Sequence, residues 1–200
     1  MTLLVAHRRN TPADLAATPA DLGIEMDIRS QGDRLVVTHE PFDAGVDLEE
    51  WLDGYRHAFL VANVKEEGLE DRVEAALAAR GIEEWAYLDQ SFPFMVRTLR
   101  RGETRCMVRV SEYESVTTAL ALAPPLVPRP QWVWLDSFTG ELPPVGDLAQ
   151  LAEAGARVML VSPELQARDP EPEVDDIRRR LAEADLELAA VCTKRPDLWG

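Results

Sequence analysis

Cysteine is scarce in this sequence, and its scarcity excludes a fold held together by a disulfide framework. The chain of 200 residues contains 2 cysteines, Cys106 and Cys192, and their spacing is not that of a metal site. Both lie in apolar segments. We therefore expect two buried, reduced thiols.

Positive charge is also scarce, because 21 lysines and arginines stand against 36 aspartates and glutamates and give a formal net charge of −15. Such a surface repels nucleic acid and anionic membranes, so we expect neither as a partner. No segment approaches the roughly 20 apolar residues that a membrane-spanning helix needs. The apolar run at the N-terminus is followed by its basic residues, the reverse of a secretory signal. We expect a cytoplasmic protein without a membrane span, and the oligomeric state stays open.

What the sequence does contain is a regular alternation of apolar and polar segments. Its 46% hydrophobic and 28% charged residues fit a single domain over residues 1–200. Eight short apolar runs are typical of strands. They cover residues 3–7, 23–29, 58–65, 85–91, 105–111, 131–137, 157–163 and 186–193. A ninth run, residues 34–39, follows the second and looks like an added strand.

Polar stretches with helical spacing separate these runs. The clearest helices are predicted at residues 68–81, 95–102, 145–155 and 170–185. Strands that alternate with helices form parallel βαβ units. Eight units predict an α/β fold, a compact (β/α)8 TIM barrel. Some of its helices must be shortened or missing, because such a barrel usually takes about 250 residues. The alternative is an open, doubly wound sheet.

Polar side chains stand at the carboxyl end of every predicted strand, where barrels carry their catalytic groups. The residues at these ends are His7, Glu25, Asp27, Asn63, Lys65, Asp89, Arg109, Asp136, Ser162 and Thr193. This regularity favours the barrel over the open sheet.

Two of these residues, Glu25 and Asp27, share one face of the second predicted strand. Side chains alternate along a strand, so positions two apart lie about 6.6 Å from each other. Two carboxylates buried together repel each other. A hard divalent cation, Mg²⁺ or Ca²⁺, removes this repulsion because it prefers carboxylate oxygen. The spacing leaves an alternative open, in which Arg29 or another base pairs with the two acids.

Basic side chains follow the same predicted strands. His7 faces inward at the end of the first strand, and Arg8 after it has paired donors that suit a phosphate. His39 closes the added strand, so two imidazoles that titrate near neutral pH could divide the roles of acid and base. Lys65 could neutralise charge that develops on a phosphoryl group, and a solvated surface lysine is an equal alternative.

The stretch from His7 to Phe42 resembles the opening of glycerophosphodiester phosphodiesterases. That family begins with His-Arg-Gly, then Asn-Thr, a Gly-x-Glu-x-Asp strand and a hairpin that ends in His-Asp. Here these positions read His7-Arg8-Arg9, Asn10-Thr11, Gly23-Ile24-Glu25-Met26-Asp27 and His39-Glu40. The segment Asn63-Val64-Lys65 falls where the family has Glu-x-Lys, and the C-terminal residues 191–199 look like the family's final Thr-Asp-x-Pro segment.

The resemblance implies a phosphoric diester hydrolase with a divalent metal in a TIM barrel. It assigns general acid and base catalysis to His7 and His39, metal binding to Glu25 and Asp27, and phosphate binding to Arg8 and Lys65.

One position departs from the family in a way that matters for the metal. The family's third metal carboxylate is Asn63 here. We expect Asp89 to supply the missing charge, and whether Asn63 or Asp89 completes the metal site stays open. Asn63 and Arg109 are expected to be further substrate-binding residues. The remaining motifs resemble a divergent branch, so glycerophosphodiesters themselves need not be the substrate.

Three functions are compatible with these residues. The first is a metal-dependent hydrolase of a small, glycerophosphodiester-like phosphodiester. The second is a catalytically impaired ligand-binding barrel that lost the third metal carboxylate. The third is a metal-free barrel in which Lys65 forms a Schiff base with a carbonyl compound. The third leaves the paired carboxylates and both histidines unexplained.

Overall fold

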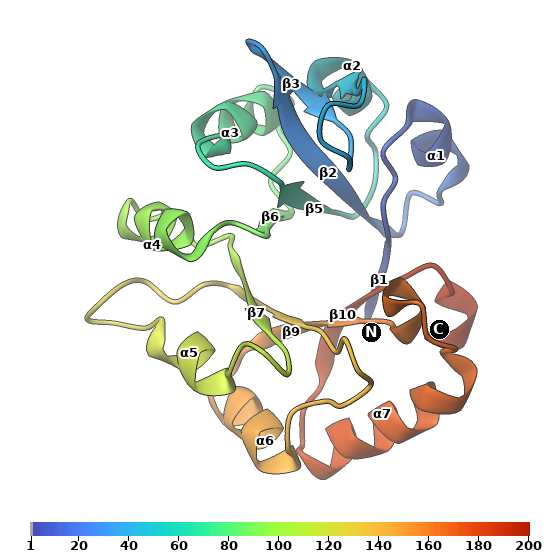
Figure 1. Cartoon of the computed structure of the whole chain (residues 1–200), viewed down its shortest axis with the longest axis vertical. Helices are drawn as coiled ribbons and strands as arrows, with labels where there is room; N and C mark the ends of the chain where they lie inside the picture. Colours follow the sequence, from blue (N-terminus) through green and yellow to red (C-terminus); the bar gives the residue numbers. More distant parts are fainter. Residues whose placement is uncertain (1) are drawn as a thin grey trace. The chain divides into compact units, whose positions relative to one another are not determined.

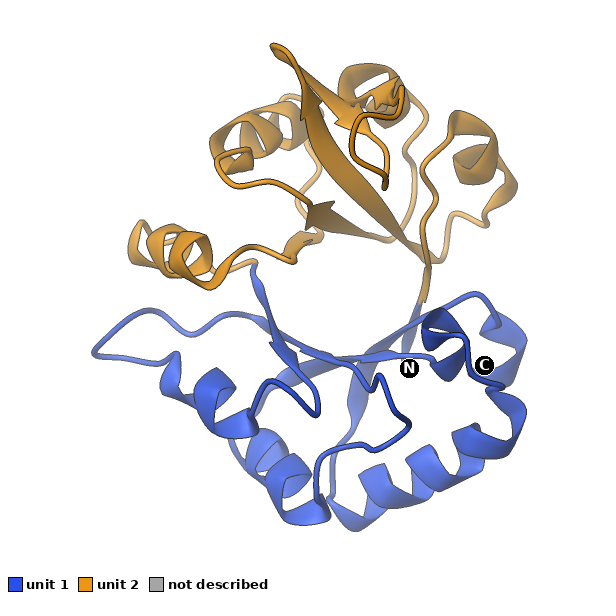
Figure 2. Cartoon of the chain, viewed as in Figure 1, with its two compact units in different colours: residues 1–4, 106–200 blue, residues 5–105 orange. Residues whose placement is uncertain are grey.

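The computed structural model describes residues 2–200 and separates into two compact units (Figure 2). Unit 2 is Val5–Arg105, and unit 1 combines residues 1–4 with Cys106–Gly200. In each unit, strands alternate with short helices along the chain (Figure 1). The predicted α/β class with a mostly parallel sheet is therefore confirmed.

The sheet of unit 2 is built around its longest strand, β2. Its strands are β1 (Leu3–Ala6, shared with unit 1), β2 (Gly23–Gln31), β3 (Arg34–Val37), β4 (Val46–Asp47), β5 (Phe59–Val64) and β6 (Trp85–Leu88). Strand β2 runs parallel to β1 and β5, and β6 extends the sheet beside β5. The added strand β3 returns antiparallel to β2, and the two-residue strand β4, which the sequence analysis missed, pairs with β3.

Four helices connect the strands of unit 2. They are α1 (Pro12–Ala17), α2 (Leu48–Asp53), α3 (Glu70–Ala78) and α4 (Phe92–Arg100). Helix α1 is short but well started, because Thr11 caps it through the backbone N–H of Asp14, and the Asp14 carboxylate accepts from Thr11 in return. Helix α4 begins three residues before the predicted start, since Pro93 fits the first turn, where a backbone donor is not needed.

Unit 1 repeats the alternation with a fully parallel set of strands. These are β7 (Met107–Val110), β8 (Trp132–Leu135), β9 (Arg157–Val161) and β10 (Leu188–Thr193), each paired with the next in the chain. Its helices are α5 (Val116–Ala121), α6 (Val145–Glu153) and α7 (Glu171–Glu183). The four strands are almost entirely buried, which explains why they read as continuous apolar runs.

Two further expectations concern the cysteines and a membrane span. Cys106 and Cys192 are both buried, reduced thiols, as predicted. Among residues 2–200, no helix combines the length and the hydropathy that crossing a bilayer requires.

In unit 1, the Glu112 carboxylate fixes the segment that follows β8. It accepts hydrogen bonds from the Ser137 hydroxyl at 3.1 Å, the Phe138 N–H at 3.0 Å, and the Thr139 N–H and hydroxyl at 2.8 and 2.7 Å. Burial raises the pKa of Glu112, but the bonds from Thr139 and Phe138 outweigh it and lower the pKa to about 2.

This network makes a pH-dependent prediction for Glu112→Gln. Because the folded-state pKa is lowered, the carboxylate stabilises the fold above the unfolded-state pKa, and this stability is lost as the pH falls toward about 2. At pH 7 the variant should lose about 1 kcal/mol, a value discounted for solvent exposure, or about 3 °C of melting temperature. Thermal unfolding at pH 7 and pH 3 should show a smaller difference in melting temperature between the wild type and Glu112→Gln at the lower pH. The control Glu153→Gln, on α6, should show little change, and a constant gap for Glu112→Gln would contradict the prediction.

Candidate active site

Polar side chains gather at the carboxyl edge of the parallel strands of unit 2. Because β1, β2, β5 and β6 run parallel, the residues that end them meet at one edge. Strand register places Asp27 directly beside Asn63. Hydrogen bonds and ion pairs connect the predicted residues found here, which are His7, Arg8, Glu25, Asp27, Asn63, Lys65 and Asp89.

Glu25 is the most enclosed acid of this group, with 1% of its surface exposed. One carboxylate oxygen, Oε2, accepts from the Arg8 backbone N–H at 2.7 Å and lies 3.7 Å from His7 Nε2. The other, Oε1, accepts from Asn63 Nδ2 at 2.9 Å. Burial raises the pKa of Glu25, the charge of Asp27 raises it further, and these bonds only partly offset both, so the pKa is about 7. The charge of Lys65 also lowers this pKa, but it does not offset the burial and the repulsion from Asp27.

Asp27 is equally buried but has stronger partners. Asn10 clamps it twice, because Asn10 Nδ2 donates to Oδ2 at 2.8 Å and the Asp27 N–H donates to Asn10 Oδ1 at 3.0 Å. Lys65 Nζ lies 3.3 Å from Oδ1, and Arg8 Nε lies 3.7 Å from Oδ2. The sequence analysis noted Asn10 only as part of a motif. An amide three residues after His7, on the loop that leaves β1, was the available signal for this contact.

The base that pairs with the acids is not Arg29, but the open alternative of another base is found at Asp27. Arg29 lies 3.6 Å from Glu66 and donates to the backbone carbonyl of His39 at 2.9 Å. The cations that accompany Asp27 are Arg8 and Lys65 instead. Lys65 also donates to Asp89 Oδ2 at 3.0 Å, so Asp89 reaches the site through this ammonium.

Asn63 has a feature that bears on metal binding. Its Oδ1 is buried and accepts no hydrogen bond from the described residues. An amide oxygen of this kind, beside two carboxylates, suits a hard divalent cation. Among residues 2–200 no group of three or more His, Cys, Asp or Glu side chains is arranged to hold a metal. The donor set that fits a cation here is therefore two carboxylates and one amide, Glu25, Asp27 and Asn63.

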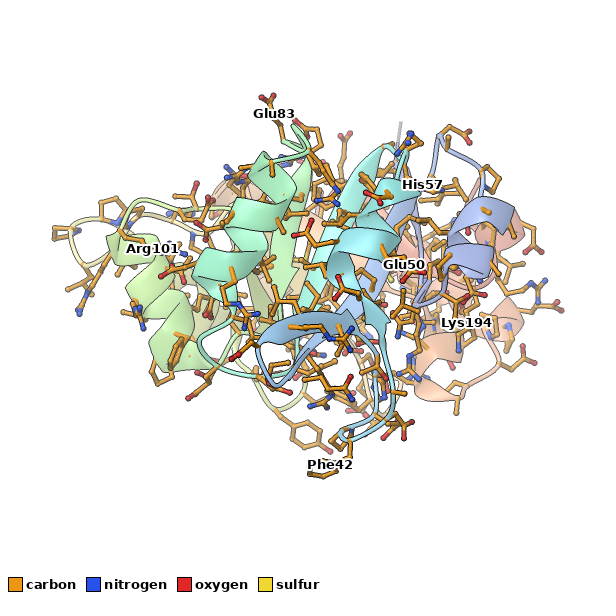
Figure 3. The ribbon with its side chains drawn as sticks, turned by 90° about the horizontal axis from the view of Figure 1, so that it is seen from above. Phe42, Glu50, His57, Glu83, Arg101 and Lys194 are labelled. Carbon is orange, nitrogen blue, oxygen red and sulfur yellow. The ribbon has the colours of Figure 1, made fainter. Side chains whose placement is uncertain are left out.

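The two remaining predicted residues have other contacts. His39 follows β3, and its Nδ1 lies 2.6 Å from Glu40 Oε1. Phe42, on the same segment, is fully exposed, and Figure 3 shows it and His57 on opposite sides of unit 2. Arg109 belongs to unit 1, where its guanidinium forms an ion pair with the buried Asp136.

Unit 1 contains a cavity beside helix α7. Its volume is about 430 Å³, and it is lined mainly by the end of α7 and the start of β10. None of the predicted site residues lines it. The candidate site is therefore defined by its charges and hydrogen bonds.

Glu25→Gln tests the electrostatic strain of the buried pair in the absence of divalent cations. The folded-state pKa is raised, so the stability that Glu25 provides is present below its unfolded-state pKa and lost as the pH rises through about 7. In EDTA, the wild-type melting temperature should fall between pH 5 and pH 8, while that of Glu25→Gln should not. The gain of the variant at pH 8 should be about 2 kcal/mol.

The control for this measurement is Glu50→Gln, an exposed acid on α2 that Figure 3 labels. It should follow the wild type at both pH values. Parallel pH profiles for wild type and Glu25→Gln would contradict the raised pKa.

Comparison with known proteins places the fold. No family model matches the sequence. No curated protein matches it either. Among solved structures, a glycerophosphodiester phosphodiesterase from Agrobacterium tumefaciens aligns over 100% of this chain and 97% of its own, with 18% identity and a TM-score of 0.67. A glycerophosphoryl diester phosphodiesterase from Parabacteroides distasonis aligns over 99% of this chain and 84% of its own, with 12% identity and a TM-score of 0.66.

Identities of 18% and 12% show a shared fold. The resemblance drawn from His7, the Glu25–Asp27 strand and the hairpin after it is confirmed at this level. The chain has the fold of solved glycerophosphodiester phosphodiesterases.

Proposed function

We propose that the protein is a metal-dependent hydrolase of a small, glycerophosphodiester-like phosphodiester that uses histidine general acid and base catalysis. The observation that carries this proposal is the buried Glu25–Asp27 pair with His7, Arg8 and Lys65 around it. The solved structures with the same fold are named as phosphodiesterases, which supports the hydrolase class. Fold alone does not fix function, so the argument depends on these residues.

We infer that the strands close into a compact (β/α)8 barrel. The alternation of strands and helices in both units supports it, and so does the likeness to the solved phosphodiesterases over the whole chain. In such a barrel the catalytic groups sit at the carboxyl ends of the strands. Lys65 directly follows β5, and Asp27 of β2 pairs with Asn63 near the end of β5.

The metal would be held by the carboxylates of Glu25 and Asp27 and by Asn63 Oδ1. When bound, Mg²⁺ or Ca²⁺ supplies charge that stabilises a phosphoryl oxygen and lowers the pKa of water. Its charge would also offset the repulsion that raises the pKa of Glu25. Asp89 as a metal ligand stays a prediction.

The chain's own side chains divide the remaining work. Arg8 and Lys65 would bind the phosphate, since both already lie beside Asp27. Binding of substrate by Arg109 stays a prediction. His7 and His39 would take and give the protons at the attacking and leaving oxygens. Glu40 would hold the ring of His39 through Nδ1, which directs Nε2 toward proton transfer.

The first experiment measures metal binding without turnover. Saturating Mg²⁺ or Ca²⁺ should raise the melting temperature of the wild type, because an ion at about 100 times its Kd adds about 2.7 kcal/mol. Glu25→Ala should abolish the shift. Glu50→Ala on α2 is the control and should keep it. A wild type that melts at the same temperature with EDTA and with either metal would contradict the metal site.

The second experiment measures hydrolysis of bis(p-nitrophenyl) phosphate in the presence of the metal. His39→Asn should lower kcat by about 10² to 10⁴, because it removes a proton-transfer group. The control His57→Asn should not, since His57 Nε2 contacts the Thr18 carbonyl at 3.0 Å, away from the acid pair. A metal-induced melting shift without any turnover would favour the second candidate, a ligand-binding barrel. The uncharged Asn63 in place of a third acid is the observation behind that candidate.

A further inference from the structure

Lys65 is one of two lysines in the sequence, and its ammonium lies between two carboxylates. Nζ is 3.3 Å from Asp27 Oδ1 and 3.0 Å from Asp89 Oδ2. The side chain is 17% exposed, so these acceptors replace much of the water that an ammonium otherwise binds. The position of this charge is therefore set by a balance between Asp27 and Asp89.

Asp89 has an unusual backbone at this point. It directly follows β6 and adopts φ 59°, in the left-handed region that few residues other than glycine enter readily. Asp and Asn tolerate this conformation better than other side chains. A left-handed residue persists where its surroundings determine it, and such residues cluster at functional sites. Here the conformation accompanies a carboxylate that reaches Lys65.

We propose that Asp89 is a positioning residue that acts through Lys65, holding the ammonium between itself and Asp27 so that it meets the phosphoryl group of the substrate. This inference rests on the proposed function. Without Asp89, the ammonium of Lys65 would lose one of these two carboxylates and would move onto Asp27. There it would leave the phosphoryl group without its charge.

A general charge effect and a positioning role predict different kinetic results when Asp89 loses its charge. Removing a negative charge near the site favours an anionic substrate and should lower KM or leave it unchanged. Misplacing Lys65 removes an interaction made in the transition state and should lower kcat. A fall in kcat without a rise in KM therefore distinguishes positioning from a general charge effect.

The test is Asp89→Asn, because asparagine keeps the left-handed backbone and lacks the charge. We expect kcat for bis(p-nitrophenyl) phosphate to fall about tenfold with KM unchanged or lower, and Asp89→Gly, which keeps φ but offers no acceptor, to lose more. The Mg²⁺ concentration for half-maximal activity should stay within about threefold of the wild type. Asp185→Asn is the matched control, since Asp185 is an exposed aspartate of unit 1 with φ 53°.

A double-mutant cycle with Lys65→Met completes the experiment. If Asp89 acts through Lys65, Asp89→Asn costs no further kcat in the Lys65→Met background. Losses of kcat that multiply in the double variant would overturn the proposal. Unchanged or faster turnover in Asp89→Asn would overturn it as well. A shift of more than about threefold in the Mg²⁺ requirement would also overturn it and make Asp89 a metal ligand.

The contact itself has a readout that needs no turnover. Melting temperatures of the wild type, both single variants and the double variant should show non-additive losses. Additive losses would show that the two side chains do not interact and would end the proposal, whatever the activity. A wild type that binds Mg²⁺ but hydrolyses nothing removes the proposed function and this inference together. Hydrolysis by the wild type with an unaffected Asp89→Asn removes only the inference.

Discussion

The candidate site depends on two carboxylates that β2 buries on one face. Glu25 and Asp27 are each 1% exposed, and their mutual repulsion has to be offset inside the protein. Asp27 receives this compensation from Asn10, Arg8 and Lys65, whereas Glu25 receives chiefly neutral donors, so its pKa is raised. This asymmetry between two neighbouring acids is the reason for proposing a cation on the side of Glu25.

Strand alternation made this pair predictable from the sequence. Ile24, Met26 and Ile28 are fully buried, and the acids between them point the other way, which follows from a period of two. The carboxyl ends of parallel strands meet at one edge, so Lys65 and Asn63 were also expected there. These predictions needed only the order and direction of the strands, which the apolar runs give.

Other parts of the site depend on contacts that no local pattern encodes. Asn10 clamps Asp27 from a loop 17 residues earlier, and that contact depends on how the loop leaves β1. The side chain of Arg8 suggested phosphate binding, but the backbone N–H of Arg8 also donates to Glu25. This contact accompanies a left-handed backbone at Arg8, with φ 52°. Likewise, Asp89 was identified as an acid at a strand end, but its link to Lys65 depends on a left-handed backbone.

Asn63 has two roles at the site, one toward Glu25 and one toward the proposed cation. A carboxylate at this position would add a third negative charge beside Glu25 and raise its pKa further in the absence of a cation. The amide instead donates to Glu25 through Nδ2 while its buried Oδ1 accepts no hydrogen bond from the described residues. One side chain thus satisfies the acid pair through its nitrogen and offers a ligand through its oxygen. A neutral oxygen attracts a cation less strongly than a carboxylate does, so this substitution favours stability without the ion over affinity for it.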